Sequence, residues 1–204
     1  MSPEEDIIYV HSVAEAYLYL KASLCRSCRK GSLNPKADLT KTAAAPGGWM
    51  LSTVCSECGA AATIHFCINP PPTREQAHSQ EINPTPHRSS AIDLLGWLTL
   101  FQAIIEASQR ETDKQAAREL AYEAALCLDE AMKFYDGDNE LPAEDAFFNE
   151  TSRRRFRDNP QQFARSKWRE RRLKLPDATT RTIPAGPRRP RRRWWQFWRG
   201  SAKP

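Results

Sequence analysis

Two cysteine pairs with the same internal spacing constrain this 204-residue chain more than any other feature of its sequence. Two residues separate Cys25 from Cys28, and two residues separate Cys55 from Cys58. Cysteines at this spacing can turn both sulfur atoms toward one point, so two such turns can surround a single centre with four sulfurs. The 26 residues between the pairs are enough for a β-hairpin or a short three-stranded sheet.

Four thiolates match the tetrahedral coordination that zinc prefers. Because a site with four sulfur ligands has no open position for water, we predict one structural Zn²⁺ held by Cys25, Cys28, Cys55 and Cys58. The alternative is a redox dithiol or a disulfide, but a thioredoxin-type site uses one pair at a strand–helix junction. The acidic start, MSPEEDIIYV, lacks the charge pattern of a secretory signal, which favours a reducing compartment and metal binding.

The residues around the second pair have the alternating pattern of β-strands, at 49–54 and 62–68. A glycine soon follows each pair, Gly31 and Gly59, which suits a tight turn around a metal. The segment 24–68 therefore resembles a zinc ribbon, and this resemblance implies a structural zinc ion without implying a particular activity. Strand alternation places His65 and Cys67 on one face, where they are alternative ligands. We prefer to interpret them as a strand histidine and a buried thiol.

The rest of the chain divides by composition, and the whole is predicted to be an α+β protein. Residues 1–68 are expected to form one domain, in which a helix at 12–24, capped by Ser12 and Glu15, packs on the ribbon. Residues 69–87 are a proline-rich linker, and 88–175 form a helical domain. In that domain we expect a helix opened by Ser90, a second helix at 115–135 completing an αα-hairpin, and a helix after Pro160.

Charge is distributed very unevenly along the sequence. Residues 1–150 contain 12 Lys or Arg and 22 Asp or Glu, a net charge of −10, whereas residues 151–204 contain 18 and 3, a net charge of +15. Residues 176–204 are predicted to be a disordered tail, because they have almost no aliphatic side chains. Arginines flank a cluster of large aromatic residues there, and we predict that these side chains bind an anionic surface: Arg188, Arg189, Arg191, Arg192, Arg193, Trp194, Trp195, Phe197, Trp198 and Arg199.

Two kinds of anionic surface suit this tail. A membrane accepts indole rings at the depth of the lipid headgroups while arginines contact anionic lipid, and each basic residue adds about 1 kcal/mol there. A nucleic acid offers phosphates to the arginines and bases on which tryptophan stacks. The membrane is slightly favoured, because four aromatic side chains within five residues can each bury roughly 150–250 Å². A third possibility is that the tail docks on a protein partner or on the acidic part of the chain.

No catalytic motif is present: the sequence has neither a glycine-rich phosphate loop nor a GxSxG or HExxH pattern. The longest apolar stretch, 91–105, is too short to span a bilayer and contains Asp93 and Gln102. We therefore predict a non-enzymatic adaptor or binding protein. Its predicted location is the cytoplasm, either free or attached to the inner face of a membrane. Its helical domain would bind a protein partner or self-associate, and no small-molecule substrate is inferred. The alternatives are a nucleic-acid-binding zinc-ribbon protein and an accessory subunit of an enzyme.

Overall fold

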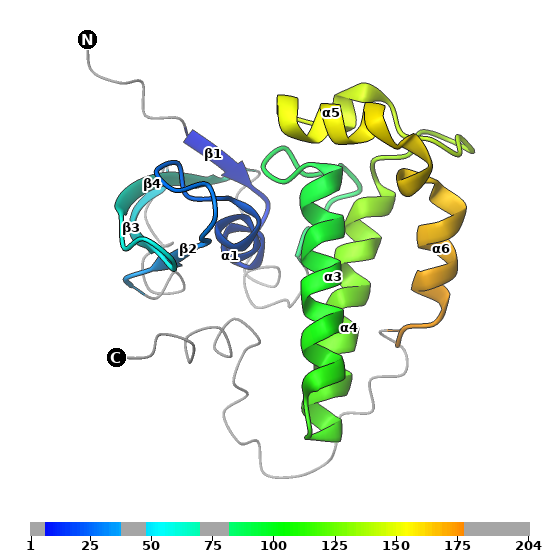
Figure 1. Ribbon diagram of the computed structural model, residues 1–204, viewed down its shortest axis with the longest axis horizontal. Coiled ribbons are helices and arrows are strands. Elements are labelled where there is room, and N and C mark those ends of the chain that lie inside the picture. Colours follow the sequence, from blue (N-terminus) through cyan, green and yellow to red (C-terminus); the bar gives the residue numbers. More distant parts are fainter. Residues whose placement is uncertain (1–6, 38–47, 70–81, 178–204) are drawn as a thin grey trace.

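The computed structural model describes residues 7–37, 48–69 and 82–177. It contains a four-stranded sheet beside a group of helices, which confirms the predicted mixture of α and β structure (Figure 1). The predicted anionic-surface residues, 188–199, lie outside the described residues. None of the described helices is both long enough and apolar enough to cross a membrane.

The sheet has the strand order β1-β4-β3-β2. Its strands are β1 (Ile7–Val10), β2 (Leu33–Pro35), β3 (Trp49–Cys55) and β4 (Ala61–Ile68). β2 and β4 both pair with β3 in antiparallel orientation, as expected for strands that flank the cysteine pairs. β1 pairs with β4 in parallel orientation, and this strand was not predicted from the sequence.

One face of the sheet is buried and the other is partly open. Trp49, Leu51 and Phe66 belong to the hydrophobic cluster on the buried face, together with Val10 from β1. Trp49 stacks on Phe66, with 5.5 Å between the ring centroids. This arrangement follows from strand alternation, because every second side chain of β3 and β4 points to the same face.

The helix α1 (Val13–Ala22) covers the buried face of the sheet. Its N-cap, Ser12, accepts a hydrogen bond from the backbone N–H of Glu15, as the sequence predicted. The Glu15 carboxylate, however, accepts from the backbone N–H of His11, at 2.5 Å.

The helices α3 (Leu94–Arg110) and α4 (Lys114–Met132) form the predicted αα-hairpin. The expected N-terminus at Ser90 is wrong by about one turn. Asp93 is the N-cap, because its carboxylate accepts a hydrogen bond from the N–H of Gly96 at 2.8 Å. The preceding residues form a turn in which the Ser89 hydroxyl accepts from the next backbone N–H groups.

The remaining helices lie against this hairpin. They are α5 (Glu150–Asp158), α6 (Arg165–Leu173) and two short 3₁₀ turns at Glu144–Ala146 and Pro160–Phe163. The helix expected after Pro160 is thus divided into a 3₁₀ turn and α6, and α5 was not predicted. In Figure 1, α6 runs beside α4. The guanidinium of Arg172 donates to both carboxylate oxygens of Asp129 in α4, at 2.7 and 3.0 Å.

The sheet and the helices share α1 as a common element. Leu18 of α1 belongs to the hydrophobic cluster of the helices, whereas Leu20 belongs to the cluster of the sheet. The end of the predicted linker also packs at this junction, since Ile82 is buried and its carbonyl accepts a hydrogen bond from the Ser12 hydroxyl at 2.5 Å. The two parts of the chain are therefore in contact through α1 and the residues that precede α3.

Candidate metal centre

The structure brings the four predicted metal ligands together. All four sulfur atoms lie within 4.8 Å of one another. The Sγ atoms of Cys25 and Cys58 are 3.8 Å apart, and those of Cys28 and Cys55 are 3.6 Å apart. In a tetrahedral site with Zn–S bonds of about 2.3 Å, neighbouring sulfurs are separated by about 3.8 Å. The four cysteines are thus positioned to coordinate one structural Zn²⁺.

Both pairs are held by backbone turns of the same kind. The residue after the second cysteine of each pair donates its N–H to the carbonyl of the first cysteine: Arg29 to Cys25 at 2.8 Å, and Gly59 to Cys55 at 3.2 Å. Arg29 and Gly59 both have a positive φ, of 57° and 71°. The expectation of a glycine in the turn holds for the second pair, whereas an arginine takes the equivalent left-handed position in the first.

Gly31 has a different role, which is to let the two cysteine turns approach each other. A Cβ atom at this position would overlap the Sγ of Cys55 and would lie 2.8 Å from the backbone nitrogen of Glu57. The carbonyl of Gly31 also accepts a hydrogen bond from the N–H of Cys25, at 2.8 Å. Gly31 is therefore needed for close packing around the metal centre, and not for an unusual φ angle.

Backbone dipoles favour the thiolate form of the first pair, which is the form that binds metal. Hydrogen bonds from the N–H groups of Cys28 and Ser27 lower the pKa of Cys25 to about 6. The N–H groups of Gly31 and Lys30 lower the pKa of Cys28 in the same way. This first turn therefore favours the thiolate form of both sulfurs.

The four sulfurs cannot all be anionic without a cation between them. The pKa of Cys58 is raised to about 12: the N–H of Ala60 lowers it, but the neighbouring sulfurs of Cys55, Cys28 and Cys25, together with burial, outweigh that effect. The raised pKa means that Cys58 favours its protonated thiol form when no cation is bound. A divalent metal ion would remove the conflict by replacing that proton, as thiolate ligation requires.

The two alternative ligands lie apart from this cluster. His65 and Cys67 are in β4, in register with Ile7 and Tyr9 of β1, and neither belongs to the group of side chains that could hold a metal among the described residues. Cys67 is half-buried. Cys127 of α4 is fully buried in the helical cluster, and burial raises the pKa of its thiol.

The first cysteine turn also presents positive charge that the sequence analysis did not single out. Arg26, Arg29 and Lys30 are all exposed, and Leu24 beside them is 59% exposed. Three cations within five residues of a cysteine pair are a recognisable signal in retrospect. The same residues that build the metal turn thus form a small cationic surface on a rigid support.

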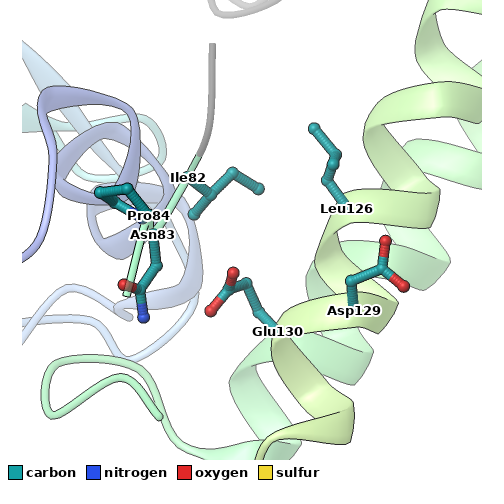
Figure 2. Close-up of a pocket in the computed structure, with 6 residues that line it drawn as sticks. All are labelled: Ile82, Asn83, Pro84, Leu126, Asp129 and Glu130. Carbon is teal, nitrogen blue, oxygen red and sulfur yellow. The ribbon is translucent and has the colours of Figure 1, made fainter. Parts of the chain in front are cut away.

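A pocket of about 200 Å³ lies where the segment before α3 meets α4 (Figure 2). The segment contributes one wall and α4 the other, and the lining residues are Ile82, Asn83, Pro84, Leu126, Asp129 and Glu130. Asp129 forms an ion pair with Arg172. The other carboxylate of the pocket, Glu130, is in a less common environment.

Glu130 is only 5% exposed. Its Oε1 accepts a hydrogen bond from the Lys133 ammonium at 2.9 Å, whereas its Oε2 has no hydrogen-bond partner among the described residues. Burial raises the pKa of Glu130 to about 7, because it outweighs the opposing effects of Lys133 and Asn83, and the negative charge of Glu15 adds a smaller increase. Sequence reasoning could not distinguish it from the other carboxylates of α4, because its burial depends on the contact with the segment before α3.

Comparison with known proteins identifies no relative of this chain. No protein-family model matches it, and neither a curated protein nor a solved structure matches it. The function therefore has to be inferred from the residues of this chain and their arrangement.

Proposed function

We propose that this chain is a non-enzymatic adaptor or binding protein, in which a zinc ribbon supports the fold and a cationic, aromatic tail attaches the protein to an anionic surface. A membrane is the favoured surface. The observation that carries the proposal is the cluster of four sulfurs, because a metal ion with four protein ligands stabilises a fold and has no open position for a substrate.

The arrangement of strands supports the ribbon. The second cysteine pair lies in the turn between β3 and β4, and the first pair lies just before β2, which pairs with β3. A single ion would therefore join two neighbouring turns of one antiparallel sheet. A small sheet of this kind has little core of its own, so the metal ion and α1 supply the stability that it needs.

The composition of the tail supports attachment to a surface. Residues 178–204 contain eight Arg or Lys and no Asp or Glu, and three tryptophans and a phenylalanine lie among the arginines. Near an anionic leaflet each basic residue contributes about 1 kcal/mol, and the indole rings are stable at headgroup depth. In this proposal the tail attaches the protein to the surface, and the folded part that contains the zinc site binds a partner.

The test compares the full chain with a chain that ends at Asp177. Both are incubated with anionic vesicles, made of phosphatidylcholine mixed with phosphatidylserine, and with neutral vesicles of phosphatidylcholine alone, and zinc is measured on both. We expect one zinc per chain in each, and binding to the anionic vesicles by the full chain only. Replacing Trp194, Trp195 and Trp198 with alanine should abolish that binding. Equal binding by the shortened chain would refute the role of the tail.

A nucleic acid is the second candidate, and the exposed cations of the first cysteine turn favour it. Arg26, Arg29 and Lys30 could contact phosphates from a rigid surface while the tail contacts bases. Binding to a single-stranded oligonucleotide should then weaken steeply with salt and should depend on these three residues. Weak or salt-insensitive binding would exclude this candidate.

A further inference from the structure

The helix α6 carries positive charges that no carboxylate of the described residues pairs with. Residues 165–174 contain six Lys or Arg and one Glu. Arg172 is paired with Asp129, Arg165 lies 3.9 Å from Asp138, and Lys174 is paired with Glu170. Within the described part of the chain, no carboxylate forms an ion pair with the three others, which are Lys167, Arg169 and Arg171, and all three are exposed.

The helix dipole does not explain these charges. Cations stabilise a helix near its C-terminus, and Arg171 fits that rule. Lys167, however, is in the first turn of α6, where a positive charge is unfavourable, and Arg169 follows in the middle of the helix. The charges of Lys167 and Arg169 are therefore available for a contact outside the folded body.

The charges stand on a rigid support. Lys167 Nζ and Arg171 Cζ lie 5.3 and 5.0 Å from the centroid of the Trp168 ring. That ring is buried against Phe101 of α3, and its indole N–H donates to the carbonyl of Gln162 at 2.9 Å. The two cations are thus held in place before any partner arrives, which lowers the entropy cost of binding.

An apolar side chain lies beside the charges. Leu173, in the last turn of α6, is 79% exposed, more than any other large apolar side chain of the described residues. A nucleic acid offers a leucine at this position little to contact, whereas the headgroup region of a bilayer accepts it. Exposed cations and an exposed leucine on one helix suit a contact with anionic lipid headgroups.

The position of α6 also fixes where the tail starts. Arg172 donates to Asp129 of α4 and pairs with Asp177 at 2.9 Å, so the last described residue is held against the hairpin. The tail therefore leaves the body at the end of α6 that carries Leu173.

We propose that the outward side of α6, with Lys167 and Arg171 along one flank and Arg169 and Leu173 along the other, binds the anionic lipid headgroups of a membrane together with the tail. This inference rests on the proposed attachment of the tail to a membrane and adds an orientation. The tail binds the membrane first, and α6 then lies against the same membrane. The two contacts together fix the orientation of the protein on the surface. The contact is electrostatic at the three cations and apolar at Leu173.

The test measures partitioning of the full chain onto the same phosphatidylcholine–phosphatidylserine vesicles at three salt concentrations. In one variant Lys167, Arg169 and Arg171 are replaced with glutamine, and in a second Leu173 is replaced with serine. The matched control replaces Arg110, Lys114 and Arg118 with glutamine. It removes the same three positive charges, but near the N-terminal end of α4, away from the end that contacts α6. Zinc content and thermal unfolding establish that each variant is folded.

A basic residue near an anionic leaflet is worth about fivefold in partitioning, so the α6 charge variant should bind roughly 100-fold more weakly. Its binding should also depend less on salt. Leu173→Ser should weaken binding about fivefold without changing the salt dependence. The control should stay within about threefold of the unchanged protein.

Each other outcome has a definite meaning. If the α6 variant and the control bind equally while removal of the tail abolishes binding, the role of α6 is overturned and the role of the tail stands. If the chain ending at Asp177 binds as well as the full chain, the proposed function of the tail is overturned, and the α6 variants still decide the role of the helix. If the full chain binds an oligonucleotide but no vesicle, both proposals are overturned.

Discussion

Replacing Glu130 with glutamine should stabilise this protein at neutral and alkaline pH. Glutamine has nearly the shape of a protonated glutamate, and its amide oxygen can still accept a hydrogen bond from Lys133. The side chain is almost fully buried, with one carboxylate oxygen that has no hydrogen-bond partner in the described structure. The substitution therefore removes the cost of burying a charge while the local packing is retained.

The size of the effect follows from the pKa of Glu130, which rises from 4.5 to about 7 on folding. Each pKa unit corresponds to about 1.36 kcal/mol, so the difference of about 2.5 units amounts to about 3 kcal/mol. The folded state holds the proton more tightly than the unfolded state. The contribution of Glu130 to the free energy of unfolding is therefore greatest below pH 4.5. It falls as the pH rises toward 7 and is constant at higher pH.

Urea unfolding at pH 5 and pH 8 measures this difference. We expect Glu130→Gln to be about 3 kcal/mol more stable than the unchanged protein at pH 8, and less than about 1 kcal/mol more stable at pH 5. Glu119→Gln, at an exposed position of the same helix, is the control and should change stability little at either pH. A Glu130→Gln protein that is less stable at pH 8, or a difference that does not vary with pH, would refute the reasoning.

Three further predictions concern the metal centre and α1. Gly31→Ala should reduce zinc retention, measured with a colorimetric chelator, because the new methyl group overlaps the Sγ of Cys55; retention equal to that of the unchanged protein would contradict the assigned role. Arg29→Gly should raise the free energy of unfolding by up to about 1 kcal/mol, since a non-glycine residue at a φ of 57° is strained, and a clear loss of stability in urea would argue against this. Leu18→Ala should cost about 2–5 kcal/mol, because this side chain is fully buried in the helical cluster. A cost near zero in the same urea measurement would mean that α1 does not support the helices.

The sequence was informative wherever neighbouring residues decide the structure. The spacing of Cys25, Cys28, Cys55 and Cys58 was enough to predict their meeting, because each pair is closed by a local turn and a single hairpin joins the turns. The alternating pattern at 62–68 was likewise enough to predict β4.

Contacts between distant residues were not predictable in this way. β1 exists because Ile7–Val10 pairs with β4, more than fifty residues away, and a four-residue apolar run alone does not indicate a strand. The burial of Glu130 depends on the packing of Ile82 and its neighbours beside α4. The unpaired charges of α6 became visible only when the partners of Arg172 and Lys174 were known.

Because α1 contributes side chains to both hydrophobic clusters, the stability of the sheet and that of the helices are linked. Leu20 packs against the sheet, whose two cysteine turns are positioned to share one metal ion. Leu18, two residues earlier in α1, packs in the hydrophobic cluster of the helices. Chelation or oxidation at the sulfurs would loosen the sheet, and the loss would pass along α1 to a bundle that contains no ligand of the ion. We therefore expect removal of the metal ion to lower the stability of the helical part as well as that of the sheet.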